Sequence, residues 1–203
     1  MKLYYMPGAC PLAAHIVLEW IGAPFEITEV KREALRSPEY LRLNPAGVVP
    51  TLVDGDFVLS ENIAILHYLA DLHPEARLAG DDNPRGRAKV NHWLGYLNSD
   101  VHQSFKPLFA PQRYIGDSSM NEDLASHAKA RLHGLFAVVD TPLTRHDWLA
   151  DSGRSIADPY LYVLLRWAKG KEVDLKGMQG LDGFFARMQA DPGVKAAEHA
   201  QGL

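Results

Sequence analysis

The stretch NPAGVVPTLVDGDFVLSEN, residues 44–62, decides the fold of this 203-residue chain. It contains two short apolar runs, residues 48–53 and 57–59, on either side of Asp54-Gly55. An Asp-Gly pair between apolar runs is a strong signal for a tight hairpin turn, because both positions tolerate the left-handed backbone that such a turn needs. The two runs are therefore predicted to form an antiparallel pair of strands.

The residues before this stretch predict a strand, a helix and a second strand. Residues 2–6 form a short apolar run that ends at Pro7-Gly8, and residues 25–30 alternate as a strand does. Between them, residues 10–20 place apolar side chains on one helical face, and Gly22 ends the segment. Two strands joined by a short helical crossover are expected to be parallel.

The order of elements divides the chain into two predicted domains. A short helix starting near Ser37 precedes the hairpin, and leucines at helical spacing follow it as far as Pro74. This β-α-β-α-β-β-α order predicts an α/β thioredoxin-like domain over residues 1–78. Residues 75–84 are polar and form a predicted linker. Residues 85–203 show helical spacing only, which predicts an all-α C-terminal domain.

Composition excludes several classes of protein. Apolar residues make up 47% and charged residues 23%, as in an ordinary globular protein. The net charge is -4 without a dense basic run, which argues against a nucleic-acid partner. Pro7 and Gly8 interrupt any leader, and no apolar stretch approaches the roughly 18 residues of a membrane span. We therefore expect a cytoplasmic protein without a membrane partner.

The cysteine and histidine content predicts no metal site. Cys10 is the single cysteine, which excludes an intramolecular disulfide and a multi-thiolate metal site. The nine histidines are scattered, and none pairs with carboxylates at ligand spacing on a shared helix face.

Pro50 is the first residue that points to chemistry. A proline that opens an apolar strand must lie where the ladder needs no N–H. At this place in the element order, thioredoxin-like folds keep a cis proline, and a cis Val49-Pro50 bond would turn the Val49 backbone toward an extended peptide. The alternative is an ordinary trans proline at a sheet edge.

Cys10 and the segment Ser60-Glu61-Asn62 both lie at predicted helix N-termini. Cys10 precedes Pro11, which suits the first turn of a helix, and the helix dipole there favours a thiolate. The alternative is a buried, inert thiol. The N–H groups at the second N-terminus suit a carboxylate, while Glu61 suits an ammonium. Both groups occur on the end of an amino acid, although Ser60 and Glu61 could equally only cap the helix.

A thiol, a peptide-binding edge and an amino-acid site along one sheet match the tripeptide glutathione. The chain also resembles the bacterial beta-class glutathione transferases over nearly its whole length. The resemblance rests on the order and spacing of KLYY (2–5), PGAC (7–10), NPAGVVP (44–50), SE (60–61), AI (64–65), HQSFKPLF (102–109), IAD (156–158) and RW (166–167).

The resemblance implies a role for residues in both domains. Cys10 would face the glutathione sulfur, Val49 beside Pro50 would pair with its cysteinyl part, and Glu61 with Asn62 would hold its γ-glutamyl end. In the helical domain, His102 would line the site as a catalytic residue. The electrophile pocket would be lined by the aromatic residues Phe105, Phe109, Tyr160 and Trp167. Asp100 would reach the glutathione of the partner subunit, which implies a homodimer.

The chain departs from the family pattern at three places. The segment after the second strand is about three residues shorter than in familiar members, so Lys31, Arg32 or Arg36 would replace the family's glutathione-binding lysine. Pro11 stands where serine is common, which removes an N–H and creates a Cys-Pro pair like that of glutaredoxins. Asn62 stands where family members have a small residue.

The resemblance implies a glutathione transferase, with glutathione as co-substrate and a small hydrophobic electrophile as acceptor. Two alternatives stay open. In one, Cys10 is itself the nucleophile of a glutathione-dependent thiol transferase or reductase. In the other, the protein is a non-catalytic binder of glutathione or hydrophobic ligands.

Overall fold

The sheet has the topology that the sequence predicts. The computed structural model describes residues 1–150 and 153–203. Its sheet has the order β2-β1-β3-β4, with strands β1 (Lys2–Tyr5), β2 (Glu26–Glu29), β3 (Thr51–Asp54) and β4 (Phe57–Ser60). β1 pairs with β2 in parallel and with β3 antiparallel. β3 and β4 form the predicted hairpin, in which Asp54 is opposite Phe57.

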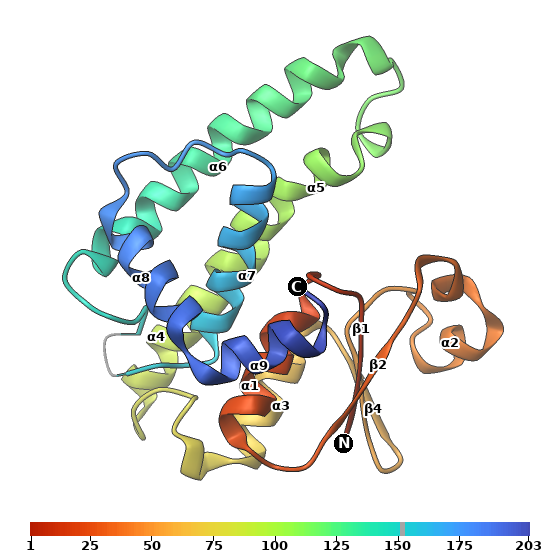
Figure 1. Ribbon diagram of the computed structural model, residues 1–203, viewed down its shortest axis with the longest axis vertical. Coiled ribbons are helices and arrows are strands. Elements are labelled where there is room, and N and C mark those ends of the chain that lie inside the picture. The colour runs from red at the N-terminus through yellow and green to blue at the C-terminus, as the bar shows by residue number, and fades with distance from the viewer. Residues whose placement is uncertain (151–152) are drawn as a thin grey trace.

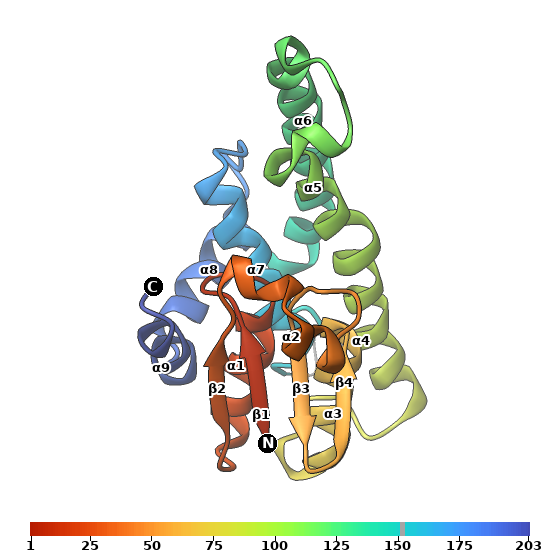
Figure 2. The same cartoon turned by 90° about the vertical axis from the view of Figure 1, so that its right-hand side faces the viewer.

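Three helices complete the N-terminal half: α1 (Pro11–Ile21), α2 (Pro38–Leu43) and α3 (Asn62–Leu72). Figure 2 shows α1 and α3 behind the sheet and α2 in front of it. A short 3₁₀ turn, η1 (Arg32–Arg36), precedes α2. α1 ends at Gly22, whose φ of 73° lies in the left-handed region where glycine is unstrained.

The C-terminal half is helical in the part that the structure describes, as predicted. Its helices are α4 (Pro84–Tyr96), η3 (Leu97–His102), α5 (Gln103–Phe109), α6 (Asn121–Leu143), α7 (Ala157–Gly170), α8 (Gln179–Ala190) and α9 (Pro192–Ala200), and its short 3₁₀ turns are η4 (Pro111–Arg113) and η5 (Ser118–Met120). A further 3₁₀ turn, η2 (Pro74–Ala76), follows α3 at the end of the N-terminal half. None of the described helices combines the length and the apolar character needed to span a membrane.

The helix that carries the predicted catalytic histidine contains a wide turn. α4, η3 and α5 follow one another without a break, and η3 is a π-helix. The segment is helical, as predicted for residues 85–203, and the π-turn is a detail that its apolar spacing does not reveal. Single π-turns within α-helices occur often at functional sites, because they reorient side chains by part of a turn.

The start of α7 is held by a buried carboxylate. Asp158 is fully buried, and it accepts hydrogen bonds from the Ser155 backbone N–H at 2.6 Å, the Ser155 hydroxyl at 3.0 Å and the Leu149 N–H at 3.0 Å. The Ala157 N–H in turn donates to the Ser155 hydroxyl at 3.3 Å. This is the reciprocal arrangement of a capping box, for which a serine followed three residues later by an acidic residue is typical.

The two halves share one hydrophobic core. α1 contacts α3 of its own half and both α7 and α9 of the C-terminal half, and Figure 1 shows it between them. Buried side chains from both halves form one continuous cluster, from Leu3 to Ala197. The domain boundary at residues 78–85 stays a prediction from the sequence, because the two halves are packed against each other along α1.

Candidate active site

The loop that presents Cys10 is held at Gly8 by two residues from the far end of the chain. The Gly8 N–H donates to Oε1 of Gln201 at 3.1 Å, and the Gly8 carbonyl accepts from Nε1 of Trp167 at 2.8 Å. Gly8 has a φ of 69°, which would strain any other residue. Gln201 is itself buried and reaches Nδ1 of His15 in α1 at 3.0 Å. The loop is therefore fixed to α1, to α7 and to the C-terminus.

The Cys10 thiol lies beside the Val49 carbonyl. Its sulfur is 3.9 Å from the Val49 oxygen, within the range of a weak S–H···O hydrogen bond. The Val49-Pro50 peptide bond is cis, as predicted. The preceding carbonyl, that of Val48, is already occupied by the Tyr40 hydroxyl and the Asn44 amide, both at 2.8 Å. The turn before β3 thus places the Val49 carbonyl next to Cys10.

The environment of Cys10 favours the thiol, which is the alternative that the sequence left open. Cys10 precedes the first residue of α1 as predicted, and the residue keeps some exposed surface. Its sulfur is nevertheless enclosed by protein, and this burial raises the pKa of the Cys10 thiol to about 12. The charge of Glu61 acts in the same direction. Burial outweighs the hydrogen bond from the Cys10 backbone N–H, which acts to lower the pKa of the thiol.

Glu61 and Asn62, at the start of α3, have an unusual backbone conformation and an unpartnered buried amide, respectively, and the Glu61 side chain does not cap the helix. Glu61 precedes α3 with φ 72° and ψ 119°, a conformation that costs a non-glycine residue about 1–3 kcal/mol. Asn62 is buried, and neither its amide nitrogen nor its amide oxygen has a hydrogen-bond partner among the described residues. Buried amides without partners are rare in folded proteins, and they call for an explanation such as a bound ligand.

His102 lies at the end of η3 in an aromatic cluster. Its Nδ1 is 2.6 Å from the Tyr160 hydroxyl, and its ring packs edge-on against Trp167 with centroids 4.9 Å apart. Burial, and then the nearby charge of Lys106, lower the pKa of His102 to about 4, so the imidazole is neutral at pH 7. Burial raises the pKa of Tyr160, with the nearby Cys10 and Glu61 as smaller causes. Tyr160 therefore lies within electrostatic reach of both N-terminal site residues.

The four predicted pocket aromatics divide into two groups. Phe105 and Tyr160 are fully buried, and so, in contrast to the prediction, they offer no surface to a ligand. Phe109 is 46% exposed and packs edge-on against Trp167, with ring centroids 5.1 Å apart. Phe105 lies behind both, stacked on Phe109 at 6.0 Å and edge-on to Trp167 at 5.5 Å. Phe109 and Trp167 present the accessible face of this cluster.

The remaining predicted residues lie on the surface. Asp100 accepts a hydrogen bond from Ser99 at 2.8 Å and lies 3.8 Å from Arg131, with a half-exposed side chain. Arg32 and Arg36 are both exposed, and Arg36 lies close to Gly47 in the loop before β3. A methyl group added at Gly47 would lie 2.9 Å from Nη1 of Arg36. Arg36 therefore covers the turn that leads to Val49.

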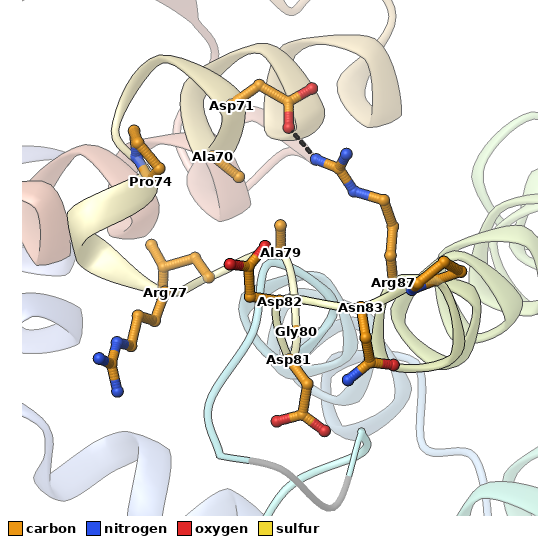
Figure 3. A pocket seen from close by; sticks show the side chains of 12 residues that line it. Ala70, Asp71, Pro74, Arg77, Ala79, Gly80, Asp81, Asp82, Asn83 and Arg87 are labelled. Carbon is orange, nitrogen blue, oxygen red and sulfur yellow. Dashed lines mark hydrogen bonds and ion pairs between the residues drawn. The ribbon is translucent and has the colours of Figure 1, made fainter.

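A separate groove lies along the linker between the two halves. It has a volume of about 860 Å³ and runs between the end of α3 and the start of α4. Figure 3 shows its polar lining, with an ion pair between Asp71 and Arg87 across it. Cys10, Glu61 and His102 do not line it. The described residues also contain no cluster of side chains that could hold a metal ion.

We expect alkylation of Cys10 in the native protein to be slow at pH 7, because the raised pKa leaves almost no thiolate. Its rate with iodoacetamide should be more than about tenfold below that of free cysteine, whose pKa is about 8.5, and should still be rising at pH 10. The protein unfolded in guanidinium is the matched control and should react like free cysteine. A native rate that is already at its plateau by pH 7 would contradict the assignment of a buried thiol.

Comparison with known proteins places this geometry in one family. The family model "Glutathione S-transferase, N-terminal domain" matches residues 1–71, and "Glutathione S-transferase, C-terminal domain" matches residues 102–192. Glutathione S-transferase GST-4.5 of Xanthomonas campestris pv. campestris is 47% identical over 203 residues, which are 100% of both chains.

Two solved structures agree over essentially the whole chain. A glutathione S-transferase from Xylella fastidiosa has a TM-score of 0.96 and 47% identity, covering 100% of this chain and 98% of its own. A bacterial beta class glutathione S-transferase from Sphingomonas chungbukensis has a TM-score of 0.88 and 35% identity, covering 100% of both. The chain therefore belongs to the glutathione S-transferase family and is a transferase of its bacterial beta class.

Proposed function

We propose that this transferase binds glutathione along the edge formed by Val49 and Glu61, and attaches it to small hydrophobic electrophiles. The observation that carries the proposal is the 3.9 Å approach of the Cys10 thiol to the Val49 carbonyl, beside the cis Pro50. A peptide paired with the Val49 backbone would bring its own cysteine next to Cys10. The strained Glu61 and the unpartnered Asn62 amide would hold the γ-glutamyl end.

In the proposed mechanism, His102 takes the proton of the glutathione thiol. A neutral imidazole has a lone pair that can accept this proton, and the imidazolium is then stabilised by the thiolate beside it. Cys10, which stays protonated, donates its S–H to the thiolate sulfur. The thiolate attacks the electrophile, a carbon–sulfur bond forms, and the leaving group departs with its electron pair. Phe109 and Trp167 hold the electrophile.

The same geometry disfavours the reading in which Cys10 is the nucleophile. A thiol attacks disulfides as its thiolate, and burial raises the pKa of Cys10 to about 12. Cys10 is better suited to donate a hydrogen bond than to attack. A cytoplasmic location belongs to the same proposal, because the reducing cytosol keeps a lone thiol free.

Replacing Cys10 with alanine separates these readings. We expect calorimetric titration with glutathione to give saturable binding for both the natural protein and Cys10→Ala, because the Val49 backbone and Glu61 are untouched. Conjugation of an aromatic halide should largely survive the change, whereas any reduction of glutathione mixed disulfides should vanish. Absence of glutathione binding by both proteins would overturn the proposed function.

Arg36, rather than Arg32, is expected to supply the positive charge near the glycine carboxylate of glutathione. Arg36 lies over Gly47, next to the turn that leads to Val49. Arg36→Ala should weaken glutathione binding about tenfold, the loss expected for one charge-assisted hydrogen bond. Arg32→Ala, which removes the same charge one turn earlier, is the control and should leave the dissociation constant unchanged. A weaker affinity for glutathione in Arg32→Ala, with no change in Arg36→Ala, would assign the contact with the glycine carboxylate to Arg32.

The enzyme is proposed to act as a homodimer in which Asp100 contacts the glutathione bound by the partner subunit. Sedimentation equilibrium at micromolar concentration should give twice the 22.6 kDa mass of the chain. Asp100→Ala should weaken glutathione binding without changing that mass, whereas Asp123→Ala, an exposed carboxylate on α6, should change neither. A single species of 22.6 kDa that binds glutathione normally would contradict both statements.

A further inference from the structure

A chain of three hydrogen-bonded side chains ends at the catalytic histidine. The Tyr160 hydroxyl donates to Oδ1 of Asn98 at 2.9 Å, and the same hydroxyl oxygen is 2.6 Å from Nδ1 of His102. Tyr160 is fully buried and comes from α7, while Asn98 and His102 lie four residues apart in η3. Asn98 is not among the residues to which the family resemblance gives a role.

The number of hydrogens shared among these three side chains determines which ring nitrogen of His102 carries the proton. A tyrosine hydroxyl has one hydrogen, and an amide oxygen can only accept. The hydrogen of Tyr160 therefore goes to Asn98, and the contact between Tyr160 and His102 needs a hydrogen from the histidine. Nδ1 of His102 then carries its proton and donates to the Tyr160 oxygen. The lone pair of the neutral ring is left on Nε2.

The ring is also held in place relative to the Cys10 loop. Trp167 packs edge-on against the His102 ring at 4.9 Å, and the same indole donates to the carbonyl of Gly8, two residues before Cys10. One side chain therefore touches both the histidine and the loop that presents the thiol. Trp167 fixes the position of the His102 ring, whereas Tyr160 and Asn98 determine which of its nitrogens carries the proton.

We propose that Asn98 and Tyr160 are positioning residues that hold His102 as the Nδ1–H tautomer, so that Nε2 accepts the proton of glutathione. This inference rests on the proposed function, in which His102 is the base. In water, a neutral histidine favours the opposite tautomer, in which Nε2 carries the proton and cannot accept another. A histidine base held as the wrong tautomer loses most of its catalytic contribution.

The proposal is tested by nuclear magnetic resonance of protein labelled with ¹⁵N-histidine, in which two-bond nitrogen–proton correlations identify the tautomer. The His102 signals are assigned by their loss in His102→Gln. The natural protein should show the Nδ1–H pattern. In Asn98→Leu, the Tyr160 hydroxyl loses its acceptor and turns to donate to Nδ1, so the pattern should change to Nε2–H. Asn98→Asp keeps an oxygen acceptor and should retain the Nδ1–H pattern.

Kinetics provide the second readout. Asn98→Leu should lower kcat for conjugation about 100-fold, the contribution expected of a general base, while KM for glutathione stays unchanged. Asn98→Asp should recover most of kcat. Tyr160→Phe removes the hydroxyl without adding bulk, and it should also lower kcat, which keeps the test valid if Asn98→Leu does not fold.

Two results would overturn the proposal. One is an Nε2–H pattern in the natural protein, which would mean that the Asn98 amide is turned and donates to Tyr160. The other is an Nδ1–H pattern in Asn98→Leu with unchanged kcat. Because the tautomer is measured without glutathione, its outcome is separate from that of the proposed function, which fails only if the natural protein does not bind glutathione or turn over electrophiles.

Discussion

The burial of α1 between the sheet domain and the C-terminal helices is the interaction on which the rest of the structure depends. Every residue from Pro11 to Leu18 is buried, and large apolar side chains such as Leu12, Ile16 and Leu18 each contribute about 1.5–3 kcal/mol by leaving water. Because α3 packs on one side and α7 with α9 on the other, the position of α1 is determined by both halves. Cys10 precedes this helix, and so its place opposite Val49 follows from the core.

The local elements could be predicted from the sequence, because each depends on residues close together in the chain. Each requires a particular backbone conformation or hydrogen bond, and the residue that supplies it lies in the same segment. Examples are the Asp54-Gly55 hairpin, the Ser155–Asp158 capping box and Gly22 at the end of α1. Pro50 was a harder case, since its cis bond followed from the element order around it rather than from its neighbours alone.

The contacts that organise the site could not be predicted, because they join residues distant in sequence. Gln201 holds Gly8 across 193 positions, and Tyr160 reaches Asn98 across 62. No local pattern marks such pairs, although the spacing of Asn98 and His102 on one helix was a signal that could have been used. The acidity of Cys10 could not be predicted for the same reason: the helix N-terminus is visible in the sequence, whereas the enclosure of the sulfur by other segments is not.

The π-turn in η3 makes the length of this helix as important as its composition. A π-helix accommodates an extra residue per turn, so deleting one residue from η3 would restore α-helical hydrogen bonding. Because the π-turn absorbs one extra residue, the helix on either side of it would keep its orientation after such a deletion. Only the side chains of the turn itself would change position. A deletion between Asn98 and His102 would shorten their separation from four positions to three, which changes how the two side chains meet Tyr160. The length of η3 therefore governs this contact locally, while α4 and α5 stay in register.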